Sequence, residues 1–209
     1  FPKSKKIVIP NPVVIHNSPH PPLNLRGGAS GALPLRFLYL GQLEPYKGLR
    51  LLLRAWKEFV VEYPDAELEI AGQGSMQKEI KRAGQDLRGV RYKGFVSHDQ
   101  ISAVFQNVNF LIMPSLAYET FGLVVAESFS AGVPVIASRL GALPELIQEE
   151  GDGFLFNPGD EADLLNTINR ALSISWSKLS ANAKKSAIRF TADQHLNNLQ
   201  GFYRTLIKP

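Results

Sequence analysis

Glu119 and Glu127 lie eight residues apart, and their carboxylates could serve one binding site. They lie on either side of the start of a predicted helix, residues 123–131, that follows a loop. The free N–H groups and the dipole at a helix start favour an anion such as phosphate. Thr120 is the expected N-cap, and Gly122 would let a ligand approach the backbone closely. Because a carboxylate can accept hydrogen bonds from sugar hydroxyls, the segment predicts a nucleotide-sugar site.

A simpler explanation is a chance pair, since two glutamates at this spacing occur in many helices and Glu127 could be an ordinary solvated residue. The neighbours of Glu127 argue for burial, because they are mostly apolar: Val124, Val125, Ala126, Phe129 and Ala131. A buried carboxylate requires a partner. We therefore expect Glu127 to have a binding role.

Composition indicates a soluble globular protein, with 209 residues, 44% hydrophobic and 20% charged. No apolar run approaches the roughly 20 residues of a membrane span, and the first residues lack a signal-peptide pattern. The absence of cysteine excludes disulfides and thiolate metal sites, and favours a reducing compartment. A net charge of +4 is compatible with anionic substrates or a lipid surface. Because the chain begins at Phe1, we expect it to be part of a longer protein.

The first 34 residues are predicted to form a short strand over 6–14 and then a loop rich in proline and glycine. His16 and His20 lie in this loop. No cluster of ligand-type residues accompanies them, so we expect them to be solvated and not to bind metal.

From residue 35 the pattern becomes regular. Strands are predicted over 35–40, 66–71, 89–95, 109–113, 132–137 and 153–156. Helices are predicted over 49–63, 75–87 (capped by Ser75), 97–108, 123–131 and 144–148, and the chain is predicted to be all helix from 160 to about 207. Alternating strands and helices with continuous apolar strands predict an α/β fold, a six-stranded parallel sheet with helices on both faces.

Ligands bind beyond the carboxyl ends of the strands in such sheets. Four loops leave strands in that direction: Gly41-Gln42, Gly72-Gln73-Gly74, residues 114–119 and residues 138–141. We expect them to meet at one rim of the sheet. This convergence predicts a site more strongly than any single motif does.

Lys47 follows the first of these loops and could neutralise a diphosphate held at the rim. It could instead be a solvated lysine, although the start of a helix is an unfavourable place for an unpaired cation. Gly94 could let a base approach the backbone of Val96; otherwise this is a plain strand end at which Ser97 caps the next helix. Gly72-Gln73-Gly74 is a weak signal by itself, and a plain tight turn is the favoured interpretation of it.

Several other site classes find no support. The sequence holds no Ser/His/Asp arrangement that we can assemble and no Walker lysine motif, and the glycine turn lacks the third glycine of a dinucleotide fingerprint. His98 and His195 are predicted to be surface residues on polar helix faces.

A series of motifs recurs in this order in one known family: Pro10-Asn11-Pro12-Val13, residues 37–49, Ile70-Ala71-Gly72-Gln73-Gly74, Gly94-Phe95-Val96-Ser97, residues 114–128, 131–138, 141–147 and 151–158. Together they cover nearly the whole chain and form a specific set. The chain resembles the retaining glycosyltransferases of the GT-B fold, known as group 1 or family 4.

The resemblance implies one half of a GT-B fold, with a Rossmann-like doubly wound sheet. Residues 1–34 would be the inter-domain connection and residues 35–190 the nucleotide-sugar donor-binding domain. Residues 191–209 would form a C-terminal helix that packs back on an N-terminal acceptor domain, or that covers the sheet or self-associates. Glu119 and Lys47 would be catalytic. The donor would be bound by Gly41, Gln42, Lys47, Gly72, Val96, Glu119, Thr120, Phe121, Gly122, Leu123, Val124 and Glu127.

Within this set, the resemblance implies that Glu119 holds the donor sugar, Glu127 the ribose, Val96 the base and Lys47 the diphosphate. It implies transfer with retention from a UDP- or GDP-sugar, without metal or other cofactor. The acceptor would be a sugar or lipid-linked saccharide, with no nucleic-acid partner. The location would be cytoplasmic or, with peripheral membrane contact, at the cytoplasmic membrane face.

One departure from the family is Gln42, which stands where an arginine partner of the lysine is usual. Arg139, or an arginine from another domain, could replace that charge. Otherwise catalysis would be weak or the donor unusual, and the chain could be an inactive nucleotide-sugar-binding module. An epimerase or a phosphorylase on the same architecture is a further alternative. The chain by itself is expected to bind donor without transferring sugar.

Overall fold

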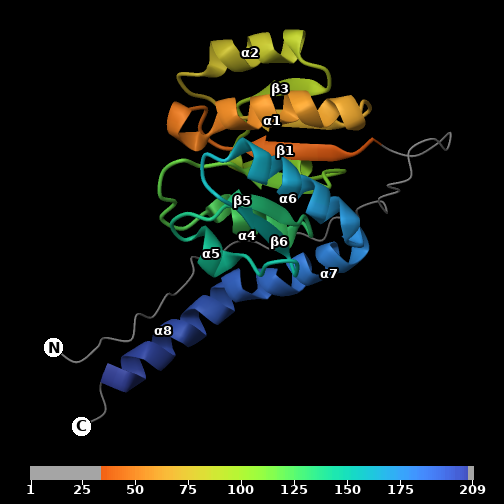
Figure 1. The fold of residues 1–209 in the computed structure, drawn as a ribbon. Helices are drawn as coiled ribbons and strands as arrows, with labels where there is room; N and C mark the ends of the chain where they lie inside the picture. The colour runs from red at the N-terminus through yellow and green to blue at the C-terminus, as the bar shows by residue number, and fades with distance from the viewer. Residues whose placement is uncertain (1–33, 207–209) are drawn as a thin grey trace.

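A computed structural model describes residues 34–206, and it forms one six-stranded sheet in the order β3-β2-β1-β4-β5-β6 (Figure 1). All strand pairs are parallel. The strands are β1 Arg36–Leu40, β2 Glu67–Ala71, β3 Val90–Gly94, β4 Phe110–Met113, β5 Val135–Ser138 and β6 Gly153–Phe156. The order reverses between β1 and β4, the point at which doubly wound sheets bind ligands.

Eight α-helices and three 3₁₀-helices connect and follow the strands within the described residues. They are η1 Pro45–Lys47, α1 Leu49–Glu62, α2 Gln77–Asp86, η2 His98–Gln100, α3 Ile101–Val104, α4 Leu123–Ser130, α5 Leu143–Leu146, α6 Glu161–Ser173, α7 Trp176–Ala187, η3 Ile188–Phe190 and α8 Ala192–Leu206. None of the helices in this part of the chain is long and apolar enough to cross a membrane.

Two apolar clusters lie on opposite faces of the sheet. One contains side chains of α1, α2 and α6 around Phe37 and Ile70, and the other contains side chains of α3, α4 and α5 around Leu38 and Leu111. Helix α7 contributes to both clusters. Neighbouring residues of β1 therefore point to opposite faces, as strand geometry requires. The predicted α/β fold, a parallel six-stranded sheet with helices on both faces, is confirmed.

Some predicted boundaries were wrong. The helix predicted over 97–108 is only η2 and α3, which end at Val104, and Asn107 then takes a left-handed conformation with φ 63°. The predicted continuous helical tail is broken at Ile174 and Thr191, whose ψ angles of 144° and 153° are extended. The strand predicted over 6–14 and the loop after it lie outside the described residues.

Two predicted helix caps were also wrong. Thr120 is not the N-cap of α4; Gly122 occupies that position, in a left-handed conformation with φ 76°. Met76, not Ser75, is the N-cap of α2, because the hydroxyl of Ser75 donates to Glu44 Oε2 at 2.5 Å. In both cases a loop contact or a glycine decided the helix start.

Strands β2 and β3 are not continuous apolar runs, contrary to prediction. Arg91 pairs with Glu67 at 2.7 Å, and Lys93 with Glu69 at 2.9 Å. These charges alternate with buried Leu68 and Ile70 and give this part of the sheet one polar face. The general expectation of a parallel sheet buried on both faces therefore overestimates how much of this side of the sheet is buried.

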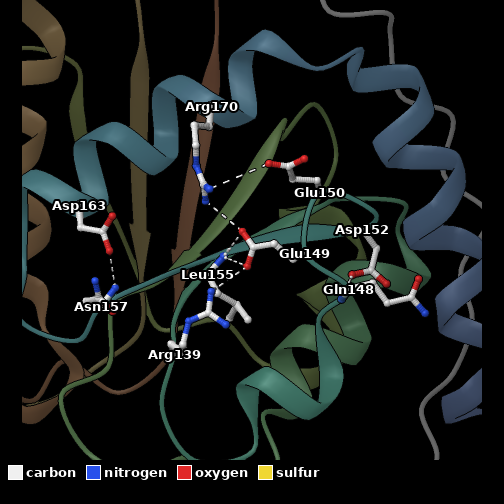
Figure 2. A network of polar contacts seen from close by, with 9 residues as sticks. All are labelled: Arg139, Gln148, Glu149, Glu150, Asp152, Leu155, Asn157, Asp163 and Arg170. Atoms are coloured by element: carbon white, nitrogen blue, oxygen red, sulfur yellow. Dashed lines mark hydrogen bonds and ion pairs between the residues drawn. The ribbon is translucent and has the colours of Figure 1, made fainter.

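Side chains along the outer strand β6 accept hydrogen bonds from one N–H group of the strand and from one just beyond it (Figure 2). The Glu149 carboxylate accepts from the N–H of Leu155 at 3.2 Å and pairs with Arg139 and Arg170 at 3.1 and 2.9 Å. Asp163 accepts from the N–H of Asn157, just beyond the strand, at 2.7 Å. Such contacts block pairing of an exposed edge with another chain.

Candidate functional site

A cavity of about 260 Å³ lies beyond the carboxyl ends of β1 and β4, where the strand order reverses. It is lined by Tyr39, Leu40, Gly41, Lys47, Met113, Ser115, Glu119, Thr120, Phe121, Gly122, Leu123 and Val124. The predicted site residues from Glu119 to Val124 thus lie together with Gly41 and Lys47, although they come from distant segments. The convergence of loops expected from the sequence places them at one rim.

The start of α4 forms one wall of this cavity. Its N-cap, Gly122, has no side chain, and no side-chain hydrogen bond caps the helix. The first backbone N–H groups of α4, together with its dipole, can therefore meet an anion in the cavity. An added Cβ on Gly122 would lie 3.3 Å from Leu146, in a conformation that other residues adopt only with strain.

Glu119 and Lys47 form an ion pair at the cavity, with 2.6 Å between Lys47 Nζ and Glu119 Oε1. The hydroxyl of Ser115 donates to the same oxygen at 2.6 Å. Of the Glu119 side chain 13% is exposed and of Lys47 22%, so solvent screens the pair only partly. A ligand here meets one cation and one carboxylate side by side.

Backbone contacts fix the segments that carry these side chains. Gly48 lies so close to the segment after β4 that an added Cβ would be 1.8 Å from the carbonyl oxygen of Pro114. The N–H of Leu116 donates to the carbonyl of Tyr46 at 2.8 Å. Lys47 and Ser115 are therefore held on two segments that are packed directly against each other.

The loop after β5 fixes Glu119 from another side. The N–H of Ala142 donates to the carbonyl of Glu119 at 3.0 Å. Gly141 has φ 62°, and an added Cβ would lie 2.6 Å from that carbonyl oxygen. This close packing explains why a glycine precedes Ala142, since a larger residue would displace the backbone of Glu119.

Gln42, the predicted substitute for an arginine, is exposed and does not line the cavity. Its backbone carbonyl accepts from Tyr39 Oη at 2.6 Å, and its Oε1 accepts from Tyr46 Oη at 2.9 Å. Burial, followed by the charge of Glu119, raises the pKa of the Tyr39 phenol, so the phenol remains a donor.

Arg139 does not supply the missing positive charge at the cavity. It is exposed, and its guanidinium pairs with Glu149 beside β6 (Figure 2). Among the described residues, Lys47 is the only cationic side chain that lines the cavity. The expectation that Arg139 takes the place of the arginine is therefore not supported.

Gly72 lies behind the cavity and supports Gly41. The N–H of Gly41 donates to the carbonyl of Ala71 at 3.1 Å. An added Cβ on Gly72 would lie 1.8 Å from the Gly41 carbonyl oxygen. Tyr92 Oη donates to the carbonyl of Gly72 at 3.0 Å. The glycine turn thus positions a lining residue without lining the cavity itself.

Glu127 and Val96 lie near the cavity without lining it. Val96 is half-buried and, like Leu40 and Val124, packs against the apolar cluster around Leu38 and Leu111. Burial raises the pKa of the Glu127 carboxyl, and the charge of His98 opposes this shift. No described residue forms a hydrogen bond or ion pair with the Glu127 carboxylate. The partner expected for it is therefore not provided by residues 34–206.

Sequence reasoning missed Tyr39, Leu40, Met113 and Ser115 as lining residues. Tyr39, Leu40 and Met113 carried no signal, because a strand residue near the carboxyl end looks like any other core residue. Ser115 precedes Glu119 by four residues, a spacing at which two side chains can meet in a compact loop. Within residues 34–206, no group of three or more His, Asp or Glu side chains could hold a metal ion.

The sequence model of the family described as glycosyl transferases group 1 matches residues 32–190, which is more than half of the chain. The chain belongs to this family. It is 34% identical over 140 residues to an uncharacterized glycosyltransferase of Methanocaldococcus jannaschii, covering 65% of this chain and 35% of the relative. This member of group 1 therefore spans about a third of the length of that relative.

Solved structures of other proteins share the fold. S. aureus TarM, solved in a complex that includes UDP, has a TM-score of 0.78 at 20% identity, covering 96% of this chain and 40% of that chain. Anabaena HepE in complex with UDP has a TM-score of 0.67 at 26% identity, covering 84% and 49%. The described sheet and helices are thus one Rossmann-like half of a GT-B fold.

Proposed function

We propose that this group 1 chain is the donor-binding domain of a retaining glycosyltransferase and binds a nucleoside-diphosphate sugar in the cavity beside Glu119. The observation that carries the proposal is the adjacency of Lys47, Glu119 and the uncapped start of α4 around one cavity. The helix start and Lys47 offer groups for a diphosphate, and Glu119 offers an acceptor for sugar hydroxyls.

The nucleotide is proposed to be UDP or GDP. Support comes from HepE, a structure 26% identical to this chain that was solved with UDP. Glu127 would accept hydrogen bonds from the ribose, which would give its carboxylate the hydrogen-bond partner that no residue of 34–206 provides. Val96 would contact the base through its backbone, since Gly94 leaves open space beside it, with nothing within 4 Å of an added Cβ.

The proposed chemistry transfers the sugar with retention and without a metal ion. Lys47 and the N–H groups of α4 would neutralise the charge that develops as the diphosphate leaves. Glu119 would lie near the anomeric carbon and hold the sugar. The acceptor, a sugar or a lipid-linked saccharide, would be bound by a further domain, so this chain alone would bind donor without transferring it. The whole protein is proposed to act in the cytoplasm or at the cytoplasmic face of a membrane.

Isothermal titration of the chain with UDP, GDP, ADP and their sugars, each with and without EDTA, tests the proposal. One nucleotide series is expected to bind with a submillimolar Kd that EDTA leaves unchanged. Lys47→Ala is expected to weaken nucleotide binding at least tenfold, because it removes the cation at the cavity. Lys57→Ala, which removes an exposed lysine on α1, serves as the control.

No binding of any nucleotide at millimolar concentration would contradict the proposal. Nucleotide binding that EDTA abolishes would contradict its metal-free part. Donor binding combined with no transfer by the longer protein would favour the inactive binding module, for which the neutral Gln42 is the supporting observation.

A further inference from the structure

One oxygen of Glu119 accepts hydrogen bonds from two donors of different character. Lys47 Nζ and Ser115 Oγ each lie 2.6 Å from Glu119 Oε1. Ser115 is buried, with 3% of its surface exposed. No residue of the described part of the chain donates to the other oxygen, Oε2, which is left to accept from a ligand.

The two donors would respond differently to an anion in the cavity. Lys47 carries a full charge on a flexible four-carbon side chain, so a diphosphate would draw its ammonium group away from Glu119. Ser115 is neutral and has a single rotatable side-chain bond before its oxygen. An anionic ligand would therefore compete for Lys47 and leave Ser115 in place.

The backbone around Ser115 is fixed before any ligand binds. The carbonyl of Pro114 packs against Gly48, and the N–H of Leu116 donates to the backbone carbonyl of Tyr46 at 2.8 Å. A group held by such contacts keeps its geometry when a neighbouring charge moves, which is the requirement for a preorganised site. Lys47 lies on the same paired segments but reaches the carboxylate only through its long side chain.

We propose that Ser115 is the positioning residue that holds Glu119 toward the donor sugar once Lys47 has turned to the diphosphate. Ser115 keeps Oε1 occupied and fixes the carboxylate, so that Oε2 faces the sugar hydroxyls. Lys47 holds Glu119 in the empty site and is exchanged for the ligand. That Oε2 of Glu119 accepts from a donor sugar rests on the function proposed above. That Ser115 holds Glu119 in place does not.

The first test compares the affinity of Ser115→Ala for a bare nucleoside diphosphate and for the matching nucleotide sugar. The variant is expected to bind the nucleotide within twofold of the unchanged chain and to lose about tenfold in its affinity for the sugar conjugate, the effect of one charge-assisted hydrogen bond. In a Glu119→Ala background the same change is expected to have no further effect. A purely structural change would weaken both ligands in both backgrounds.

Ser128→Ala is the matched control, since it also removes one buried serine hydroxyl. This hydroxyl donates to the carbonyl of Val133 at 2.8 Å and not to Glu119. Equal losses for nucleotide and nucleotide sugar, or no loss for either, would overturn the proposal. So would an additive effect of Ser115→Ala in the Glu119→Ala background.

A second test needs no nucleotide and separates this proposal from the proposed function. Crystal structures of Lys47→Met and of the double variant Lys47→Met, Ser115→Ala would show Glu119 without its cation. Glu119 is expected to stay within hydrogen-bond distance of Ser115 in the single variant and to lose a single ordered position in the double variant. If Glu119 leaves Ser115 in Lys47→Met, or stays ordered in the double variant, Ser115 does not position it.

Discussion

The Glu127 carboxylate reduces stability in its charged form, because burial raises its pKa and the charge of His98 offsets this shift only in part. With a pKa raised in the folded state, its contribution to stability is fully present below about pH 4.5, the unfolded value. The contribution is lost as the pH rises through the folded pKa. A role in binding can explain why the chain has a carboxylate that lowers the stability of the fold at neutral pH.

Glu127→Gln is therefore expected to raise the thermal midpoint at pH 7.5 by roughly 1–3 °C, and to leave it unchanged at pH 4. The same variant is expected to bind nucleotide about tenfold more weakly, because the amide is a poorer acceptor for ribose hydroxyls. Calorimetry at both pH values and titration with nucleotide measure the two effects. Glu58→Gln, on the exposed face of α1, is the control and should change neither. A lower midpoint at pH 7.5 would contradict the prediction.

At this scale, the sequence could indicate the groups of the cavity but not their partners. Glu119 and Lys47 were expected to face a ligand, and the structure also shows them paired with each other. Such a pair joins residues 72 positions apart, which no local pattern can reveal. Tyr39 was missed for a different reason: as a strand residue it looked like any other core residue, and its hydrogen bond to the carbonyl of Gln42 depends on the conformation of the loop.

Among the elements, the loop between β5 and α5 has the clearest role, because its backbone supports Glu119. Gly141→Ala would force a Cβ to within 2.6 Å of the Glu119 carbonyl oxygen. It is expected to lower donor affinity at least tenfold and stability by about 1–3 kcal/mol, through strain at a positive φ and displacement of Glu119. Nucleotide titration and chemical denaturation measure the two effects.

Gly159→Ala is the matched control for this prediction. Gly159 also has a positive φ, 80°, but an added Cβ would approach only Leu116, at 3.9 Å. Its substitution should reproduce the strain at positive φ without the loss of donor affinity. Equal affinity losses in both variants would show that the Glu119 contact is not the cause.

The segment before β6 is joined to α7 by one buried carboxylate. Asp152 is fully buried; it accepts from the N–H of Gln148 at 2.7 Å and from Ser186 Oγ at 2.5 Å, and Arg189 lies 3.6 Å away. Burial is the largest influence and raises its pKa, although these partners oppose the shift. The contact fixes α7 against the sheet.

Asp152→Ala would leave the part-buried N–H of Gln148 and the buried hydroxyl of Ser186 without their acceptor. The variant is expected to lose about 2–4 kcal/mol of stability at pH 7, the effect of two donors that lose their partner. Denaturant unfolding measures this loss. Asp86→Ala, at an exposed position on α2 paired only with Arg82, should cost less than about 0.5 kcal/mol. A loss below about 1 kcal/mol for Asp152→Ala would contradict the expected role.

Element types were predictable where apolar periodicity was strong, and some boundaries were as well, such as both ends of β6 and the starts of α1 and α4. The stripe of α1 and the apolar run of β4 gave the correct elements. The predicted start of α4 at Leu123 is correct, but its N-cap is Gly122 in a left-handed conformation and not Thr120. The helix before β4 is short because Asn107 reverses the chain. Such effects of single residues are not visible in a periodic pattern.

For the whole molecule, the order of the sheet follows from rules that the sequence obeys. Alternating strands and helices give right-handed crossovers and a parallel sheet, and the reversal between β1 and β4 brings the cavity loops together. The polar face of β2 and β3 is an exception to these rules. The alternation Glu67, Leu68, Glu69 indicates a strand with one exposed face, whereas the general rule for parallel sheets predicts burial on both faces.

The C-terminal helix α8 extends beyond the sheet along the direction of α7 (Figure 1). None of the residues in 192–206 is buried, and Leu196, Tyr203 and Leu206 are more than half exposed. The match to the family also ends at residue 190. These observations predict that α8 adds little to the stability of the sheet domain.

A chain that ends at Phe190 is therefore expected to unfold within about 2 °C of the full chain and to bind nucleotide with the same affinity, because the apolar clusters remain complete without α8. Calorimetry and titration of the two chains measure both quantities. If the apolar stripe of α8 joins copies of the chain, light scattering will show a mass that rises with concentration for the full chain only. A midpoint more than about 5 °C lower in the shorter chain would instead show that α8 unfolds together with the sheet as one cooperative unit.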